Sequence, residues 1–155
     1  MKTYGKESFL PYTMEVMEAV LQEPYRLDAV PRSERAEILE ETPFKWTYTL
    51  KREGWSDVVY DCDSSYDNAQ KTLTIHFTSR VKQLTDDCII TLYRVGDFRT
   101  RMYVTYHIRY NMLKWTHAWV RIRVALSGHK SYVDTIFHLI DKINELAAEK
   151  QKELS

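Results

Sequence analysis

The hydrophobic period changes in the last third of the chain, and this change constrains the fold more than any other feature. Apolar residues occupy every second position over Phe98–Tyr110 and again over Trp115–Leu126. After Ser127-Gly128 the period becomes that of a helix and continues to about Leu146. A period of two predicts a strand with one buried face, and a period near 3.6 predicts a helix with one buried stripe. The sequence therefore predicts an antiparallel hairpin followed by an amphipathic helix.

The predicted hairpin has an apolar face and a basic, aromatic face. If residues 111–114 form its loop, matching the apolar faces pairs His107 with Trp119 and Tyr103 with Arg123. A slip of one residue would bury the arginines, so the division into two faces follows from the pattern. The helix is expected to begin near Ser131, where Asp134 completes a capping box.

The preceding residues predict an antiparallel sheet with two short helical segments. Residues 2–9 are expected to form the first strand and 11–21 a short helix, which ends at Pro24. Residues 25–35 read as a turn or a second short helix. Alternating patterns predict four further strands: 44–50, 56–62, 73–79 and 88–95. Gly96-Asp97 is expected to be a tight turn.

The composition is typical of one globular domain spanning residues 1–155, with a charged tail at 149–155 that is expected to fray. Hydrophobic residues make up 44% of the chain, and only 4 Gly and 4 Pro argue against long linkers. Cys62 and Cys88 have no CxxC motif or His partner, which favours free thiols over a disulfide. No segment resembles a signal peptide or approaches the roughly 18 apolar residues of a membrane span. These features predict a cytoplasmic protein.

The sequence carries no pattern typical of a metal, cofactor or catalytic site. The five histidines lack metal-ligand spacing, and we find no nucleophile motif, Gly-rich phosphate loop or paired inward carboxylates. The acidic run at residues 61–68 reads as a hairpin turn, because a calcium loop would also require a central Gly and a distal Glu. We therefore expect no metal and no cofactor, and we favour a binding protein over an enzyme.

The order of these elements resembles the START-like (SRPBCC, birch-pollen-allergen-like) superfamily. Leu10-Pro11 with Val16-Met17 is similar to the motif that opens the first helix of that family, and Gln22-Glu23-Pro24 is similar to the step that ends it. The resemblance implies an α+β helix-grip fold, in which a curved seven-stranded antiparallel sheet wraps around a long C-terminal helix. It also implies a hydrophobic cavity between sheet and helix. Some members of the superfamily are aromatase/cyclases.

The inward side chains of such a fold form the first candidate site. Three of them, Tyr48, Tyr60 and Tyr106, carry phenols that need a partner when buried, and ligand, water or protein can supply it. A filled core is the alternative. We expect the ligand-binding residues to be Trp46, Tyr48, Tyr60, Ile75, Phe77, Ile90, Leu92, Val104, Tyr106, Ile108, Ile122, Ile136 and Ile140. The expected function is to bind or carry a lipid-like or polycyclic molecule without catalysis; if the protein were a cyclase, Tyr106 would position the reactive chain.

The opposite face of the hairpin forms the second candidate site. Residues 94–123 contain seven Lys and Arg and the single acid Asp97. The expected surface residues are Arg99, Arg101, Tyr103, His107, Arg109, Trp119, Arg121 and Arg123. Bases interleaved with aromatics suit a solvated sheet surface, a protein or homodimer contact, or single-stranded RNA. We rank these three interpretations in that order.

Overall fold

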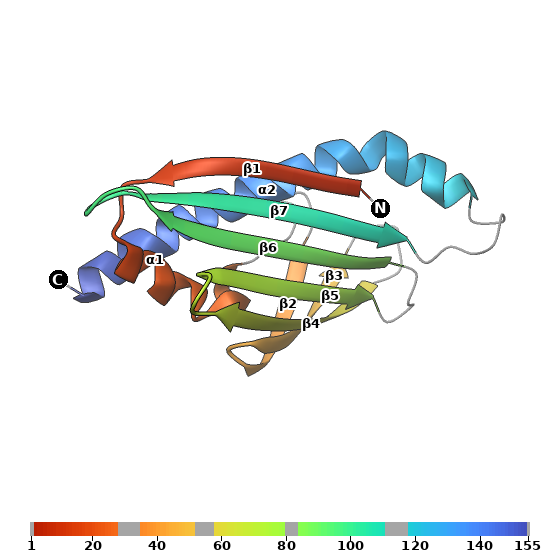
Figure 1. The fold of residues 1–155 in the computed structure, drawn as a ribbon. Coiled ribbons are helices and arrows are strands. Elements are labelled where there is room, and N and C mark those ends of the chain that lie inside the picture. The colour runs from red at the N-terminus through yellow and green to blue at the C-terminus, as the bar shows by residue number, and fades with distance from the viewer. Residues whose placement is uncertain (1, 28–34, 52–57, 80–83, 111–117, 155) are drawn as a thin grey trace.

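The computed structural model describes residues 2–27, 35–51, 58–79, 84–110 and 118–154. Within these residues seven strands form one antiparallel sheet in the order β1-β7-β6-β5-β4-β3-β2 (Figure 1). The strands are β1 (Lys2–Leu10), β2 (Arg35–Thr42), β3 (Lys45–Lys51), β4 (Val58–Asp67), β5 (Thr72–Ser79), β6 (Leu84–Arg94) and β7 (Thr100–Tyr110). Two short helices, α1 (Met14–Leu21) and the 3-10 helix η1 (Pro24–Leu27), follow β1, and the long helix α2 (Ala118–Leu154) follows β7. The predicted α+β class, antiparallel sheet and C-terminal helix are confirmed.

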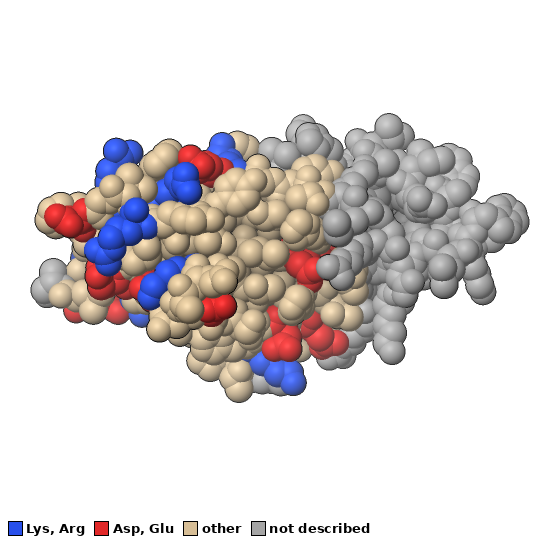
Figure 2. Space-filling view, in the orientation of Figure 1, with Lys and Arg blue, Asp and Glu red and all other residues tan. Residues whose placement is uncertain are grey.

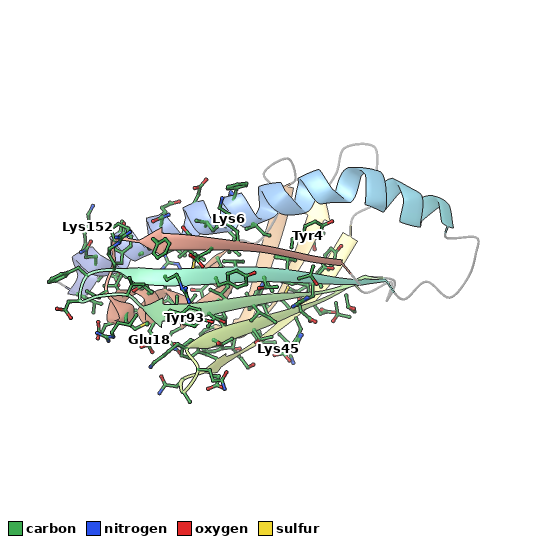
Figure 3. The ribbon with its side chains drawn as sticks, turned by 45° about the horizontal axis from the view of Figure 1, so that its top comes forward. Tyr4, Lys6, Glu18, Lys45, Tyr93 and Lys152 are labelled. Carbon is green, nitrogen blue, oxygen red and sulfur yellow. The ribbon has the colours of Figure 1, made fainter. Side chains whose placement is uncertain are left out.

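The helix α1 ends at Leu21, as the sequence predicted, but begins at Met14 rather than at residue 11. The hydroxyl of Thr13 accepts a hydrogen bond from the backbone N–H of Val16 at 3.3 Å, which satisfies one of the free donors of the first turn. Pro24 follows the last turn and prevents the α-helix from continuing. Glu18 ties α1 to the β4–β5 hairpin, because it accepts a hydrogen bond from the Tyr66 phenol at 3.2 Å and pairs with Lys71 at 3.1 Å. Glu18 is labelled in Figure 3.

The segment 118–126 is helical, so the strand predicted over Trp115–Leu126 is wrong. The helix α2 begins at Ala118 and contains 37 residues. The two edges of β7 are already occupied: β6 pairs along one of them and β1 along the other, from Lys2 opposite Ile108 to Leu10 opposite Thr100. A hairpin partner after β7 therefore has no free edge on which to form hydrogen bonds.

This correction changes three related predictions. His107 lies opposite Thr3 and Asp87, not Trp119. Tyr103 lies opposite Glu7 and Thr91, not Arg123. The proposed capping residues Ser131 and Asp134 lie inside α2 and do not start it. The segment 149–154, where fraying was expected, is also helical.

The acidic run at residues 61–68 is also placed differently from the prediction. Residues 61–67 belong to β4, and the turn follows at 68–71, with Lys71 at a positive φ of 52°. The side chains of Asp61 and Asp63 are exposed, whereas Cys62 between them is buried. The acids of this run therefore mark the solvent side of a strand rather than a loop.

One buried cluster joins the sheet to the three helices. In the strands at the centre of the sheet, alternate residues are buried, as a period of two requires. The side chains of Met17 and Leu21 on α1, Leu27 on η1 and Ile143 on α2 are fully buried in the same cluster. The main contacts of α2 are with α1, β1, β7 and η1. We call the side of the sheet that contributes to this cluster the inner face, and the opposite side the outer face.

Candidate functional site

The inner face brings together the residues expected to bind a ligand. All of those whose side chains the structure describes are buried in the one cluster: Trp46, Tyr60, Ile75, Phe77, Ile90, Leu92, Val104, Tyr106, Ile136 and Ile140. The side chains of Tyr48, Ile108 and Ile122 lie outside the described residues, and the backbone of Ile122 belongs to α2 rather than to a strand. The grouping is observed, and ligand binding by these residues stays a prediction.

The inner face is apolar near α1 and carries polar atoms further along the strands. The row of cross-strand neighbours closer to α1 consists of Leu73, Ile90 and Val104. The next row consists of Ile75, Cys88 and Tyr106, and Tyr4 lies opposite Tyr106. The row beyond it contains Trp46, Cys62, Phe77 and Asp86. An elongated molecule lying along the strands would therefore meet hydrocarbon at one end and polar groups at the other.

Asp86 is a buried acid that the sequence analysis missed. Its exposed fraction is 7%, and it shares the inner face with Cys88 and Ile90. The prediction started this strand at Cys88, whereas β6 begins at Leu84. Extending the alternation of Leu92, Ile90 and Cys88 back by one step would have placed Asp86 on the same face.

Two aromatic rings lie on either side of β6 at this position. The rings of Phe77 on β5 and Tyr106 on β7 are stacked, with centroids 6.1 Å apart and an interplanar angle of 16°. This separation is ordinary for a packed aromatic pair, and both rings belong to the buried cluster. Asp86 lies directly opposite Phe77, and Cys88 directly opposite Tyr106. The carboxylate is therefore beside an aromatic surface.

Both cysteines are free thiols, as the sequence predicted, and they are buried. Burial raises the pKa of the Cys62 thiol, and the negative charge of Asp61 adds to this effect. Burial likewise raises the pKa of the Cys88 thiol, with a further contribution from the charge of Asp86. Because the thiolate is the nucleophilic form, neither cysteine is suited to covalent catalysis.

The structure describes no cluster of side chains suited to a metal ion. Within the described ranges, no group of three or more His, Cys, Asp and Glu side chains has the arrangement that a metal requires. His76 instead pairs with Asp87 on the outer face, and Nδ1 of His107 lies 2.9 Å from the hydroxyl oxygen of Thr3. Both histidines take part in cross-strand contacts of the sheet.

The basic, aromatic surface predicted from the sequence does not form as one face. Trp119, Arg121 and Arg123 belong to α2, so they are not strand neighbours of Tyr103 and His107. Arg109 is in β7, but its side chain lies outside the described residues. The outer face of the described strands therefore carries only part of the predicted set, Arg101, Tyr103 and His107, and Arg99 lies in the connection between β6 and β7.

The arginines near the β6–β7 turn have partners within the protein. Arg101 lies 3.8 Å from Glu7 and its guanidinium is 4.4 Å from the centre of the Tyr93 ring. The guanidinium of Arg99 is 5.4 Å from the centre of the Phe9 ring. Figure 2 shows basic and acidic side chains intermingled at this end of the molecule. Paired charges of both signs suit a solvated surface better than a nucleic-acid site, which needs a continuous positive potential.

The comparisons with known proteins identify the fold. No family model and no curated protein matches the sequence. An aromatase/cyclase from Streptomyces sp. R1128 is similar in structure over 99% of this chain and 96% of that chain, with a TM-score of 0.62 and 11% identity. A norcoclaurine synthase from Thalictrum flavum, in complex with dopamine and hydroxybenzaldehyde, matches over 96% of this chain and 87% of that chain, with a TM-score of 0.65 and 12% identity. The chain has the START-like (SRPBCC) fold.

A third START-like match is a protein from Thermus thermophilus. It has a TM-score of 0.62 and 11% identity, and the match covers 96% of this chain and 98% of that chain. The TM-scores show a shared fold, and identities of 11–12% do not extend the likeness to activity. None of the helices in the described part of the chain combines the length and apolar character needed to cross a bilayer.

Proposed function

We propose that this START-like protein binds a hydrophobic small molecule between the inner face of the sheet and α2, and carries it without chemical change. The main support for this proposal is the composition of the inner face. It joins a row of aliphatic side chains near α1 to a row of aromatic and polar ones further along the same strands. Ligand sites typically combine a mostly apolar lining with a few placed polar groups.

The similarity to the Thalictrum flavum enzyme supports the choice of a small molecule. That structure was determined with dopamine and hydroxybenzaldehyde, two small aromatic compounds, in a chain that shares the START-like fold. The inner face of the present protein offers matching chemistry, because Phe77 and Tyr106 present stacked rings beside Asp86. The raised pKa values of the two buried thiols favour carriage over covalent catalysis.

A fluorescence assay with two matched variants tests the proposal. The dye 1-anilinonaphthalene-8-sulfonate reports on apolar sites, and its displacement by naphthalene derivatives measures their affinity. Val104 is fully buried on the inner face, whereas the adjacent Thr105 points to the outer face and is half-buried. We expect Val104→Phe to weaken dye binding about tenfold, because the larger side chain fills ligand volume, and Thr105→Phe to leave it unchanged.

Three results would contradict the proposal. Native protein that binds neither dye nor naphthalenes has no such site. Equal effects of Val104→Phe and Thr105→Phe would place the dye elsewhere, provided that thermal unfolding shows both variants to be folded. A ligand recovered from the protein with an altered mass would indicate a chemical reaction and therefore an enzyme rather than a carrier.

A further inference from the structure

Asp86 places a negative charge at one end of the proposed ligand site. The carboxylate is 7% exposed, and the other described side chains buried on the inner face are apolar, aromatic or sulfur-containing, apart from Thr100. It already interacts within the protein. A further opposite charge placed beside a buried carboxylate favours its ionised form.

The neighbours of Asp86 indicate which opposite charge would fit. Phe77 lies directly opposite Asp86 on β5, Cys62 lies opposite Phe77 on β4, and Trp46 lies opposite Cys62 on β3. Tyr106 stacks on Phe77 from the other side of β6. A carboxylate bordered by aromatic rings is the combination that binds an ammonium group, which forms a charge-assisted hydrogen bond with the acid and a cation–π contact with the rings.

The apolar part of a ligand would extend from this position toward α1. Ile75 and Ile90 occupy the inner face in that direction, followed by Leu73 and Leu92. Cys88 lies two residues from Asp86 on the same face of β6, and burial, followed by the charge of Asp86, raises the pKa of its thiol. The site therefore has a charged end and an apolar end, separated along the strand direction.

We propose that the ligand is a hydrophobic amine whose ammonium group pairs with Asp86 and whose aromatic body packs on Phe77 and Tyr106. This inference rests on the proposed function, since it names the ligand class of the same site. It gives the acid a role in recognition in addition to its interaction within the protein.

Two probes that differ in one group test the inference. The compounds 2-(naphthalen-2-yl)ethylamine and 2-(naphthalen-2-yl)ethanol share a ring system and a chain length, but only the amine is charged at pH 7. We expect native protein to bind the amine about tenfold more tightly than the alcohol, the effect of one charge-assisted contact. Asp86→Asn should abolish this preference, and Asp86→Glu should retain it.

The adjacent acid supplies a matched control. Asp87 faces the outer side of β6 and pairs with His76, so Asp87→Asn removes the same charge from the same strand without altering the site. It should keep the full preference for the amine. Equal binding of both probes to native protein, or a preference that survives Asp86→Asn, overturns the inference and leaves the proposed function standing. If neither probe nor the dye binds, both this inference and the proposed function are contradicted. The comparison of the two probes on native protein needs no variant to fold.

Discussion

Asp86 and Asp87 are adjacent in sequence but lie on opposite faces of β6. Asp86 is buried on the inner face beside Phe77, whereas Asp87 is hydrogen-bonded to His76 on the outer face. The pleat of the strand alone produces this difference, because successive side chains point to opposite sides. The same substitution at the two positions therefore tests two different surfaces of the protein.

Truncation of Ile143 should destabilise the fold strongly. This side chain is fully buried on α2, and Ile143→Ala removes methyl and methylene groups from the packed cluster. We expect the free energy of unfolding to fall by about 2–5 kcal/mol. Urea denaturation followed by circular dichroism measures the change. Glu145→Ala, at a side chain that is 72% exposed, should change it by less than about 0.5 kcal/mol; equal effects at both positions would show that α2 does not pack on the sheet as described.

Glu23 should stabilise the protein above about pH 4.5 and lose its effect in acid. It lies 2.9 Å from Arg26 and 3.1 Å from Lys150, and so joins η1 to the end of α2. Hydrogen bonds from Arg26 and then Lys150 lower the pKa of Glu23 below its ordinary value of 4.5. A lowered folded-state pKa means that the contribution is complete above the unfolded value and is lost as the pH falls through the folded value.

The measurement is the urea midpoint of native protein and Glu23→Gln at pH 7 and pH 3. Since the pair is partly exposed, we expect a loss of about 0.5–1 kcal/mol at pH 7. The difference between the two proteins should be smaller at pH 3, because Glu23 of the unfolded chain is protonated below its ordinary pKa of 4.5 while the folded-state pKa is lower. A difference that is constant with pH would assign the effect to packing instead of charge.

The two thiols should be protected from thiol–disulfide exchange in the folded protein. Burial raises the pKa values of Cys62 and Cys88, so almost no thiolate is present at pH 8. We expect 5,5′-dithiobis(2-nitrobenzoic acid) to react slowly with native protein. In 6 M guanidinium chloride, about the concentration at which hyperstable domains unfold, it should rapidly release two equivalents of thionitrobenzoate, one for each thiol. Rapid reaction of either thiol without denaturant would show that the inner face is open to solvent there.

An Ala side chain at Gly5 should force the phenol of Tyr103 to move. A Cβ atom at Gly5 would lie 2.7 Å from the phenol oxygen of Tyr103, across the β1–β7 pair. This oxygen is the far end of an exposed side chain that can move away, so we expect Gly5→Ala to lower stability by less than about 1 kcal/mol. In a Tyr103→Ala background, Gly5→Ala should stabilise by about 0.5–1 kcal/mol, because Ala reduces the backbone entropy of the unfolded chain. Thermal unfolding of native protein, the two single variants and the double variant provides the double-mutant cycle. If the stability changes of the two single variants add up to that of the double variant, the predicted contact is contradicted.

Local sequence patterns correctly predicted several faces and ends of helices and strands. The alternation of Val104 and Tyr106 correctly identified the inner face of β7, and Pro24 correctly ended α1. The same reasoning placed Trp46 and Phe77 in the common buried cluster. It missed Asp86, because an acid in a short apolar run is ordinarily taken to lie outside the strand.

What the sequence determined by itself is the period of each segment, since the direction of a side chain depends on local backbone geometry. It could not determine which edge of β7 was available, because that depends on β1, about 100 residues earlier in the chain. With β1 on one edge and β6 on the other, the alternating residues after 117 had no strand to pair with and became the first turns of α2. Tertiary structure therefore decided the state of that segment, and with it the division of the predicted basic surface between a strand and a helix.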